Sequence, residues 1–213
     1  MYIPPQFEEV SADAISGVIE EAPLACVVAN TRSGLVANHL PLLKHPQGDL
    51  IGHAALANDM HRLITDGQEV LAVFRRDDAY VSPNFYPSKQ EHHRHVPTWN
   101  YKVVHAYGTI TFQHDAHAKR AAVGLLTRYH ERRVNGAEAW RMADAPAEYM
   151  TTMLEGIVAF RIAVTRVLAK SKLSQNLEAR DYFGTVEGLR ASGHADMAER
   201  MAERMAARAD RGR

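Results

Sequence analysis

The order of strand-like and helical segments constrains the fold of this chain more than any other feature. Roughly six segments alternate apolar and polar residues in the way that is typical of β-strands. Helical patterns interrupt them without the regular strand–helix repeat of a parallel sheet. The order therefore predicts an α+β fold, built on an antiparallel six-stranded β-barrel with peripheral helices, rather than a parallel doubly wound sheet. The expected strands cover residues 24–30, 35–43, 50–54, 69–75 with 79–81, 98–113 and 156–170.

Two strong helices are expected between residues 115 and 155. Asp115 is a suitable N-cap for the first helix, which extends to about Arg133. Asp144 and Pro146 open the second, and Gly156 stops it. We expect a helical insertion in a single domain of residues 1–190, with shorter helices at 11–21 and 58–64.

Residues 191–213 are predicted to form a C-terminal helical tail. Met197, Met201 and Met205 recur every four residues in a background of Ala, Glu and Arg. From Ala198 onward, five Arg face three acidic residues, which is a weak excess for a nucleic-acid-binding arm. We interpret the tail as a marginal helix or a contact between two copies of the chain.

Composition excludes several classes of partner. Lys plus Arg and Asp plus Glu number 25 each, so no net charge draws the chain to nucleic acid or to a membrane surface. No stretch approaches the roughly 18 apolar residues of a membrane span. Cys26 is the only cysteine, so no disulfide framework or cysteine-based metal site is available, and we expect a cytoplasmic protein.

The segment from Ser82 to Tyr107 carries an unusual mixture of aromatic, amide, hydroxyl and basic side chains. Residues 99–102, Trp-Asn-Tyr-Lys, are costly to bury unless each polar group has a partner, so this strand suits a flat, anionic ligand. Trp99 is equally well explained as a core residue. The preceding sequence HHRH, residues 92–95, lacks the helical spacing of a zinc site, and we expect a solvated loop and no metal.

A second polar segment, residues 170–176, follows the last long strand. Its sequence, KSKLSQN, combines ammonium, hydroxyl and amide groups that match phosphate oxygens. The alternative is an ordinary polar turn with a helix cap at Ser174. His39, His53 and His105 lie in expected strands, where each is either a ligand-binding group or a structural histidine.

The usual motifs of three large enzyme classes are absent. The sequence has no G-x-G-x-x-G, no P-loop and no G-x-S-x-G. No acid–base pair or nucleophile can be named from spacing, so the catalytic residues are unknown.

Seven motifs, in this order, resemble the PaiB family of FMN-binding negative transcriptional regulators. They are MYIPPQF (1–7), VANHLPLL (36–43), GHAALAN (52–58), AYVSPNFYPSK (79–89), VPTWNY (96–101), HAYG (105–108) and SKLSQN (171–176). The resemblance extends to about Leu189. It implies an FMN-binding split barrel, a homodimer with the flavin near the interface, and a link to repression of sporulation and protease genes.

The resemblance also implies which residues contact the cofactor. In related split-barrel flavoproteins, the segments matching 38–40 and 53–54 and the start of the long strand surround the flavin. At 52–54 this chain reads Gly-His-Ala and lacks the phosphate-binding lysine of oxidase-like relatives, so Lys89, Lys172 or His53 would have to replace it. The expected FMN-binding residues are Asn38, His39, His53, Ser82, Lys89, Thr98, Trp99, Asn100, Lys172, Ser174, Gln175 and Asn176.

The predicted function is thus an FMN-binding transcriptional regulator that forms a homodimer. Neutral charge and the lack of a helix-turn-helix signature count against direct DNA contact, so a regulatory protein partner is an alternative. The competing hypothesis is a flavin-dependent oxidoreductase or a haem-handling protein, because split barrels host both kinds of activity.

Overall fold

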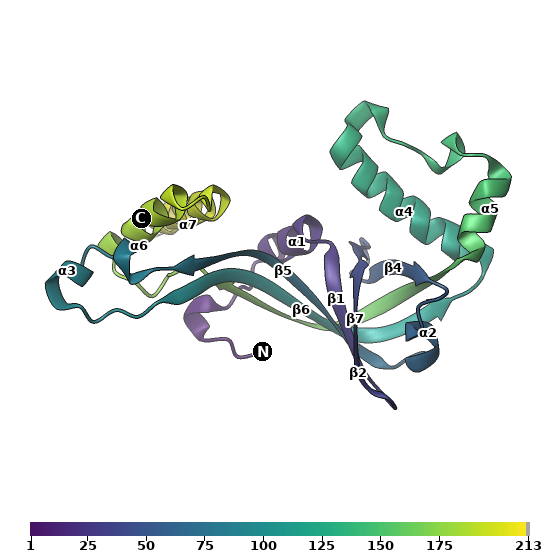
Figure 1. Cartoon of the computed structure of the whole chain (residues 1–213), viewed down its shortest axis with the longest axis horizontal. Helices are drawn as coiled ribbons and strands as arrows, with labels where there is room; N and C mark the ends of the chain where they lie inside the picture. Colours follow the sequence, from purple (N-terminus) through teal and green to yellow (C-terminus); the bar gives the residue numbers. More distant parts are fainter. Residues whose placement is uncertain (212–213) are drawn as a thin grey trace. The chain divides into compact units, whose positions relative to one another are not determined.

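The computed structural model describes residues 1–211 and divides them into two compact units (Figure 1). The first unit contains residues 1–14, 75–103 and those from Ala169 onward, and the second contains residues 15–74 and 104–168. The long strands β5, β6 and β7 contribute residues to both units. The domain boundary expected at residue 190 stays a prediction.

Seven strands form one sheet in the order β2-β1-β5-β6-β7-β4-β3. β1 pairs antiparallel with β2 and β5, and β4 pairs antiparallel with β3 and β7. Six strands were expected, and the described residues contain a seventh, β3. This strand has only two residues and is too short to show an alternation of apolar and polar residues. The strands are β1 (Leu24–Thr31), β2 (Gly34–Pro41), β3 (Leu43–Lys44), β4 (Leu50–Ala55), β5 (Glu69–Val81), β6 (Thr98–Gln113) and β7 (Ile157–Lys172).

Short helices connect and cover these strands. In the described residues, each of ten helical segments lies wholly inside one or the other of the two units. The exception is α1, which begins in the first unit and continues into the second. The α-helices are α1 (Ala12–Glu21), α2 (Met60–Leu63), α3 (Lys89–His92), α4 (Ala116–Asn135), α5 (Ala147–Glu155), α6 (Ala179–Ala191) and α7 (Ala195–Arg211), and the 3-10 helices are η1 (Pro5–Phe7), η2 (Pro83–Phe85), η3 (Gly136–Glu138) and η4 (Met142–Asp144). Within the described residues, none of the helices is long and apolar enough to cross a membrane.

The second unit contains the β1–β2 hairpin and the helical insertion. Thr31 pairs with Gly34 across the turn, where Gly34 adopts a φ of +99° that suits glycine. Asp115 accepts a hydrogen bond from the backbone N–H of Ala118 and caps α4, as its sequence predicts. α4 packs on β4 and on α5. The core of this unit includes Val27, Ala72, Phe74, Ile110, Phe160 and Ile162.

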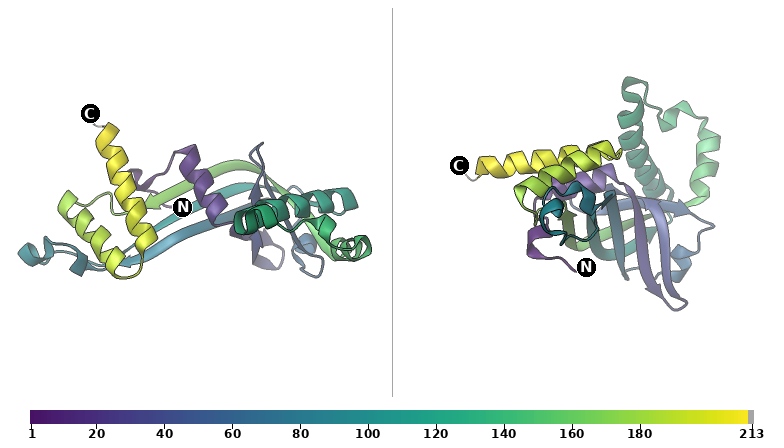
Figure 2. Two further views of the ribbon diagram at one scale, coloured as in Figure 1. Left: turned by 90° about the horizontal axis from the view of Figure 1, so that it is seen from above. Right: turned by 60° about the vertical axis from the view of Figure 1, so that its left-hand side comes forward.

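The first unit has a core of its own under α6 and α7. The two helices lie next to each other in Figures 1 and 2 and are in contact. Met197 and Met201 are buried in this core, so the methionines of the tail pack inside the chain and are not simply a surface for a second copy. The core comprises Ala79, Val81, Tyr86, Leu173, Tyr182, Val186, Leu189, Met197, Ala198 and Met201.

Strand β5 changes its pattern of burial halfway along. Its buried residues are even-numbered up to Phe74 and odd-numbered from Ala79. Between the two halves, Asp77 has a φ of +47°. A break in the alternation at a left-handed residue is typical of a β-bulge. The Asp77 carboxylate forms ion pairs with Arg76 (3.2 Å) and with Arg200 on α7 (2.8 Å).

Candidate functional site

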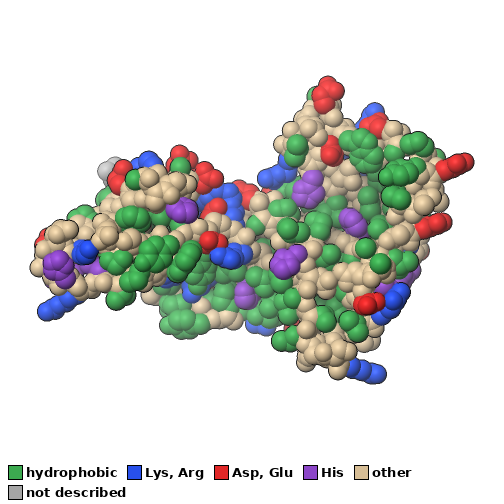
Figure 3. All heavy atoms as spheres, in the orientation of Figure 1, with side chains coloured by type: hydrophobic (Ala, Val, Ile, Leu, Met, Phe, Trp, Pro, Cys, Tyr) green, Lys and Arg blue, Asp and Glu red, His purple; other side chains and the backbone are tan. Residues whose placement is uncertain are grey.

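An exposed aromatic pair marks one face of the first unit's strands. The rings of Tyr80 on β5 and Trp99 on β6 meet edge to face with their centroids 5.8 Å apart. Tyr80 keeps 47% and Trp99 52% of their surface exposed, although large aromatic side chains in a strand usually pack in a core. Figure 3 shows hydrophobic side chains gathered over β5 and β6 of this unit.

Lys172, near the end of β7, lies beside this pair. Its ammonium donates hydrogen bonds to the hydroxyl of Thr98 and to the carbonyl oxygen of Trp99 (2.6 Å). A lysine has three N–H donors, so one remains for another acceptor. Burial, and then the nearby charge of Lys170, lower the pKa of Lys172. Lys172 thus joins the Thr98 hydroxyl to the backbone of Trp99 and holds its ammonium beside the strand that carries the exposed ring.

The N-terminal segment of the chain lies against the same lysines. The ammonium of Lys170 donates to the carbonyl oxygen of Tyr2 (3.3 Å) and lies 5.2 Å from the centroid of the Tyr101 ring. The ring of Phe7, on η1, is 5.9 Å from the ammonium groups of both Lys170 and Lys172. These cation–π contacts hold the two ammonium groups at the edge of the aromatic face.

Asn100 points to the opposite side of β6, towards α7. It is fully buried (0% exposed), accepts a hydrogen bond from the Ser174 hydroxyl at 3.1 Å and donates one to the sulfur of Met201 at 3.5 Å. Successive strand residues face opposite ways, so Trp99 and Asn100 do not form one wall. The joint contact of both residues with the flavin ring therefore does not fit this geometry, and a cofactor role for Asn100 stays a prediction.

The polar turn after β7 satisfies most of its own donors. The Gln175 side chain accepts from the backbone N–H of Leu173 (2.6 Å) and donates to the carbonyl oxygen of Ser171. Ser174 is buried in a left-handed conformation, with a φ of +62°. Asn176 is exposed. The structure thus favours the turn interpretation for Ser174 and Gln175 and leaves Lys172 as the group turned to the aromatic face.

Ser82 and Lys89, also expected to bind the cofactor, have local partners. Ser82 caps η2 by accepting from the backbone N–H of Asn84 (3.2 Å), and the Lys89 ammonium donates to the Asn84 side chain. Both residues lie in the first unit, and among the described residues neither forms a hydrogen bond or ion pair with Lys172 or Trp99.

The structure reveals a buried polar cluster that the sequence did not indicate. Ser88 is buried and donates hydrogen bonds from its hydroxyl (2.6 Å) and its backbone N–H (3.0 Å) to Asp181 on α6. His95 Nε2 is 2.6 Å from the same hydroxyl, and its ring packs on Tyr86. Because Ser88 has only one hydroxyl proton, Nε2 of His95 must be the donor in that contact. His95, expected in a solvated loop, is therefore mostly buried.

The remaining expected residues belong to the second unit. Asn38 accepts a hydrogen bond from the Asn58 amide (2.8 Å), and His39 is exposed opposite Cys26 in the β1–β2 hairpin. His53 on β4 lies opposite Ala159, and burial lowers its pKa. Among the described residues, the Nδ1 atoms of His53 and His105 are buried without a hydrogen-bond partner. Orphaned buried nitrogens of this kind are uncommon and indicate unused binding capacity.

The chemistry of these groups fits FMN. An aromatic face suits an isoalloxazine ring, and a lysine with a free N–H beside a hydroxyl suits phosphate or ribityl oxygens. Fold and donor set together define a split-barrel flavoprotein. The comparison with known proteins makes this specific: residues 1–166 match the family described as "Putative FMN-binding domain", and the chain belongs to that family. The match confirms FMN as the expected cofactor.

A bacterial relative of similar length supports the resemblance to PaiB. The chain is 31% identical over 208 residues to the "Protease synthase and sporulation protein PAI 2" of Bacillus subtilis, covering 96% of both chains. It is also 31% identical over 177 residues to an uncharacterized protein of Aspergillus fumigatus, covering 76% of this chain and 67% of the relative.

Solved structures confirm the fold. A FAD- and haem-binding protein from Mycobacterium smegmatis superposes with a TM-score of 0.59 and 16% identity, covering 82% of this chain and 78% of that chain. The flavocytochrome Anf3 from Azotobacter vinelandii gives a TM-score of 0.58 at 13% identity, covering 83% and 74%. At these identities the likeness shows the split-barrel fold alone.

Proposed function

We propose that this chain is an FMN-binding negative regulator of gene expression that works as a homodimer in the cytoplasm. The observation that carries the proposal is the exposed Tyr80–Trp99 pair with Lys172 beside it. Similarity to PAI 2 over nearly the whole length of both chains supports a regulatory role of the kind that the relative's name describes. The single cysteine is consistent with a reducing compartment.

In this proposal Trp99 lies against the isoalloxazine ring, and Lys172 with Thr98 faces the phosphate or the ribityl chain. Bound FMN would supply reversible one- or two-electron transfer. The protein's part is to hold the ring on an aromatic surface and to neutralise the anionic end with a lysine that Thr98 and the Trp99 carbonyl orient. Other candidates for contact with FMN are secondary, because most of their polar groups have local partners or lie apart from this face. They are Ser82, Lys89, Ser174, Gln175 and Asn176.

The exposure of the same face supports the proposed homodimer. A ring stacked on Trp99 would have its other side in water, and a second copy of the chain placed there would cover it together with Tyr80. Neutral net charge does not favour direct binding to DNA, so we propose that repression acts through a protein partner.

The test of FMN binding is the absorbance spectrum of the protein as purified, followed by titration of the apoprotein with FMN. We expect a flavin spectrum and an FMN affinity in the micromolar range or tighter, on the order of −8 kcal/mol. Trp99→Ala should weaken FMN binding, whereas Tyr149→Ala, which removes an exposed aromatic residue from α5, should leave it unchanged. Absence of a flavin spectrum together with no saturable FMN binding would overturn the proposal.

A flavin-dependent oxidoreductase or haem-handling protein is the second candidate. It is favoured by the buried, unpartnered Nδ1 atoms of His53 and His105, since imidazole nitrogens can ligate haem iron or transfer protons. Bleaching of the flavin by NADH or NADPH, or a haem absorbance band on addition of haemin, would support this function. A salt-dependent gel shift on promoter DNA would instead point to a regulator that contacts DNA itself.

A further inference from the structure

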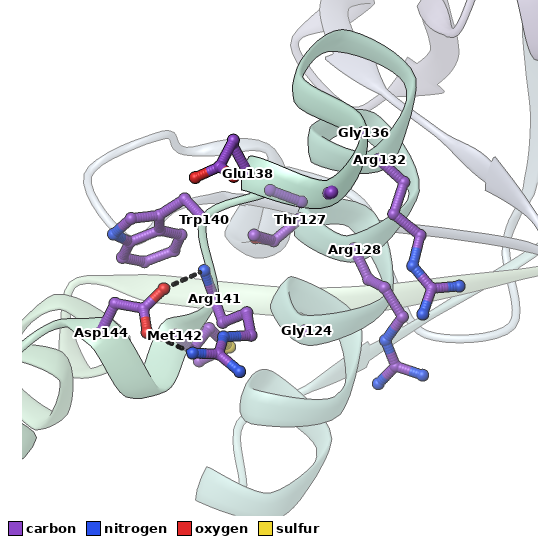
Figure 4. Close-up of a pocket in the computed structure, with 12 residues that line it drawn as sticks. Gly124, Thr127, Arg128, Arg132, Gly136, Glu138, Trp140, Arg141, Met142 and Asp144 are labelled. Carbon is purple, nitrogen blue, oxygen red and sulfur yellow. Dashed lines mark hydrogen bonds and ion pairs between the residues drawn. The ribbon is translucent and has the colours of Figure 1, made fainter.

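The helical insertion of the second unit contains a groove that is separate from the flavin-facing residues. It lies between α4 and the segment of residues 136–144 that carries η3 and η4, with a volume of about 710 Å³. Figure 4 shows Arg128 and Arg132 on the helix side and Trp140, Arg141 and Met142 on the loop side. Gly124 also lines the groove, and a Cβ at this position would lie 3.5 Å from the sulfur of Met142.

Two of the three arginines that line the groove have no anionic partner. Arg141 donates to Asp144, which neutralises it. Within residues 1–211, the guanidinium groups of Arg128 and Arg132 form no ion pair or hydrogen bond, although the two residues lie one helical turn apart. Like charges at this spacing repel each other and destabilise a helix unless an anion neutralises them. Two guanidinium forks on the same helix face are well suited to phosphate.

The opposite wall is held in place by specific hydrogen bonds. Glu131 accepts from the side-chain amide of Asn135 (2.8 Å) and from the backbone N–H of Trp140 (3.0 Å). The backbone N–H of Arg141 donates to Asp144 (2.8 Å), which closes the next turn. Trp140, 42% exposed, is therefore fixed at the edge of the groove with its indole accessible. An ordered aromatic side chain can stack on a flat ring without a large loss of side-chain entropy.

We propose that this groove binds a small molecule that carries a phosphate group and a flat ring, of the size of a mononucleotide. The phosphate contacts Arg128 and Arg132, and the ring lies towards Trp140. A volume of about 710 Å³ falls in the range of small-molecule sites, roughly 300–1,000 Å³. The site does not depend on the proposed regulatory function, because none of its residues belongs to the aromatic face around Trp99.

Isothermal titration calorimetry of the protein as purified, freed of unbound FMN by gel filtration, tests the proposal. The probes are AMP, inorganic phosphate and adenosine. We expect AMP to bind at one site per chain, inorganic phosphate to bind more weakly, and adenosine not to bind. Equal affinities for AMP and inorganic phosphate would overturn the role of Trp140. Binding of an oligonucleotide but not of AMP would overturn the proposal in favour of a nucleic-acid surface.

Substitutions test whether the heat measured with AMP comes from binding in the groove. Arg128→Gln with Arg132→Gln should weaken AMP binding roughly tenfold or more, because two charge-assisted hydrogen-bond donors are lost. Gly124→Leu should fill part of the groove and block binding while raising the helix propensity of α4. Arg120→Gln removes an exposed arginine of α4 outside the groove and should change nothing. If wild type does not bind AMP, or all four proteins bind it equally, the groove is not the site.

Discussion

The hydroxyl of Ser88 donates a 2.6 Å hydrogen bond to the carboxylate of Asp181, and the backbone N–H of Ser88 donates to the second oxygen of the same carboxylate. The two residues are 93 positions apart, and both are buried. The pair attaches the segment after η2 to α6. Burial tends to raise the pKa of Asp181, but the bonds from Ser88, with the nearby charges of His95 and Arg180, hold that pKa below its ordinary value.

This pair predicts a loss of stability in acid. Because the pKa of Asp181 is lower in the folded state, its stabilisation is complete above the unfolded-state pKa of about 3.9 and is lost as the pH falls through the folded-state value. Ser88→Ala should lower the free energy of unfolding by about 1–3 kcal/mol at pH 6. The deficit should shrink near pH 3. Urea denaturation at both pH values measures it, with the exposed Ser33→Ala as the control.

The two candidate phosphate-binding lysines can be separated by substitution. Lys172→Met should weaken FMN binding by roughly tenfold or more, since it removes the cation beside Trp99. Lys89→Met should have little effect, because Lys89 is bonded to Asn84. FMN titration of both variants, with Lys44→Met as a lysine of the second unit, gives the comparison. The reverse order of effects would move the phosphate to the loop around Lys89.

Gly184 on α6 is predicted to tolerate no side chain. A Cβ at this position would overlap the backbone carbonyl oxygen of Phe85 and the ring of Pro87. Gly184→Ala should therefore destabilise the protein by about 1–3 kcal/mol despite the better helix propensity of alanine. Gly17→Ala on α1, where no atom lies within 4 Å, should stabilise by about 0.5–1 kcal/mol. Thermal unfolding that shows the same change for both would contradict this packing.

Met201 is expected to be essential to the core of the first unit. It is fully buried, and its sulfur accepts the amide hydrogen bond of Asn100. Met201→Ala should cost about 2–5 kcal/mol, because it leaves a cavity and an unsatisfied buried donor. Met153→Ala on α5 removes an exposed methionine and should stay within about 0.5 kcal/mol of wild type. A small effect at Met201 would mean that α7 does not pack as described.

Local signals in the sequence were sufficient for most strands and for the helical insertion. Asp115 caps α4 as expected, and Pro146 directly precedes α5. Helix α6 was missed, because Gly184 and Gly188 depress its helix propensity. Both glycines are there for tertiary reasons, since side chains at either position would collide with Phe85. Propensity alone cannot report a contact between segments so far apart in the chain.

The candidate site was predictable in composition but not in orientation. Trp99, Thr98 and Lys172 were expected to meet the cofactor. Lys172 bonds the Thr98 hydroxyl and the Trp99 carbonyl oxygen, and the cofactor role of all three stays a prediction. Asn100 was expected beside Trp99, yet α7 covers its side of the strand. Helix α7 belongs to the C-terminal tail, which the sequence led us to interpret as a marginal helix or a contact between two copies of the chain. The link between Ser88 and Asp181 had no local sequence signal at all.

The left-handed residue in β5 has a consequence for the exposed aromatic pair. Asp77 lies at the break after which odd-numbered side chains become buried, so Ala79 and Val81 enter the core and Tyr80 is left outside next to Trp99. Had the even-numbered alternation continued past Phe74, Tyr80 would be buried and its two neighbours exposed. A shift of one position in the alternation of this strand thus places one aromatic side chain, and not two aliphatic ones, at the surface.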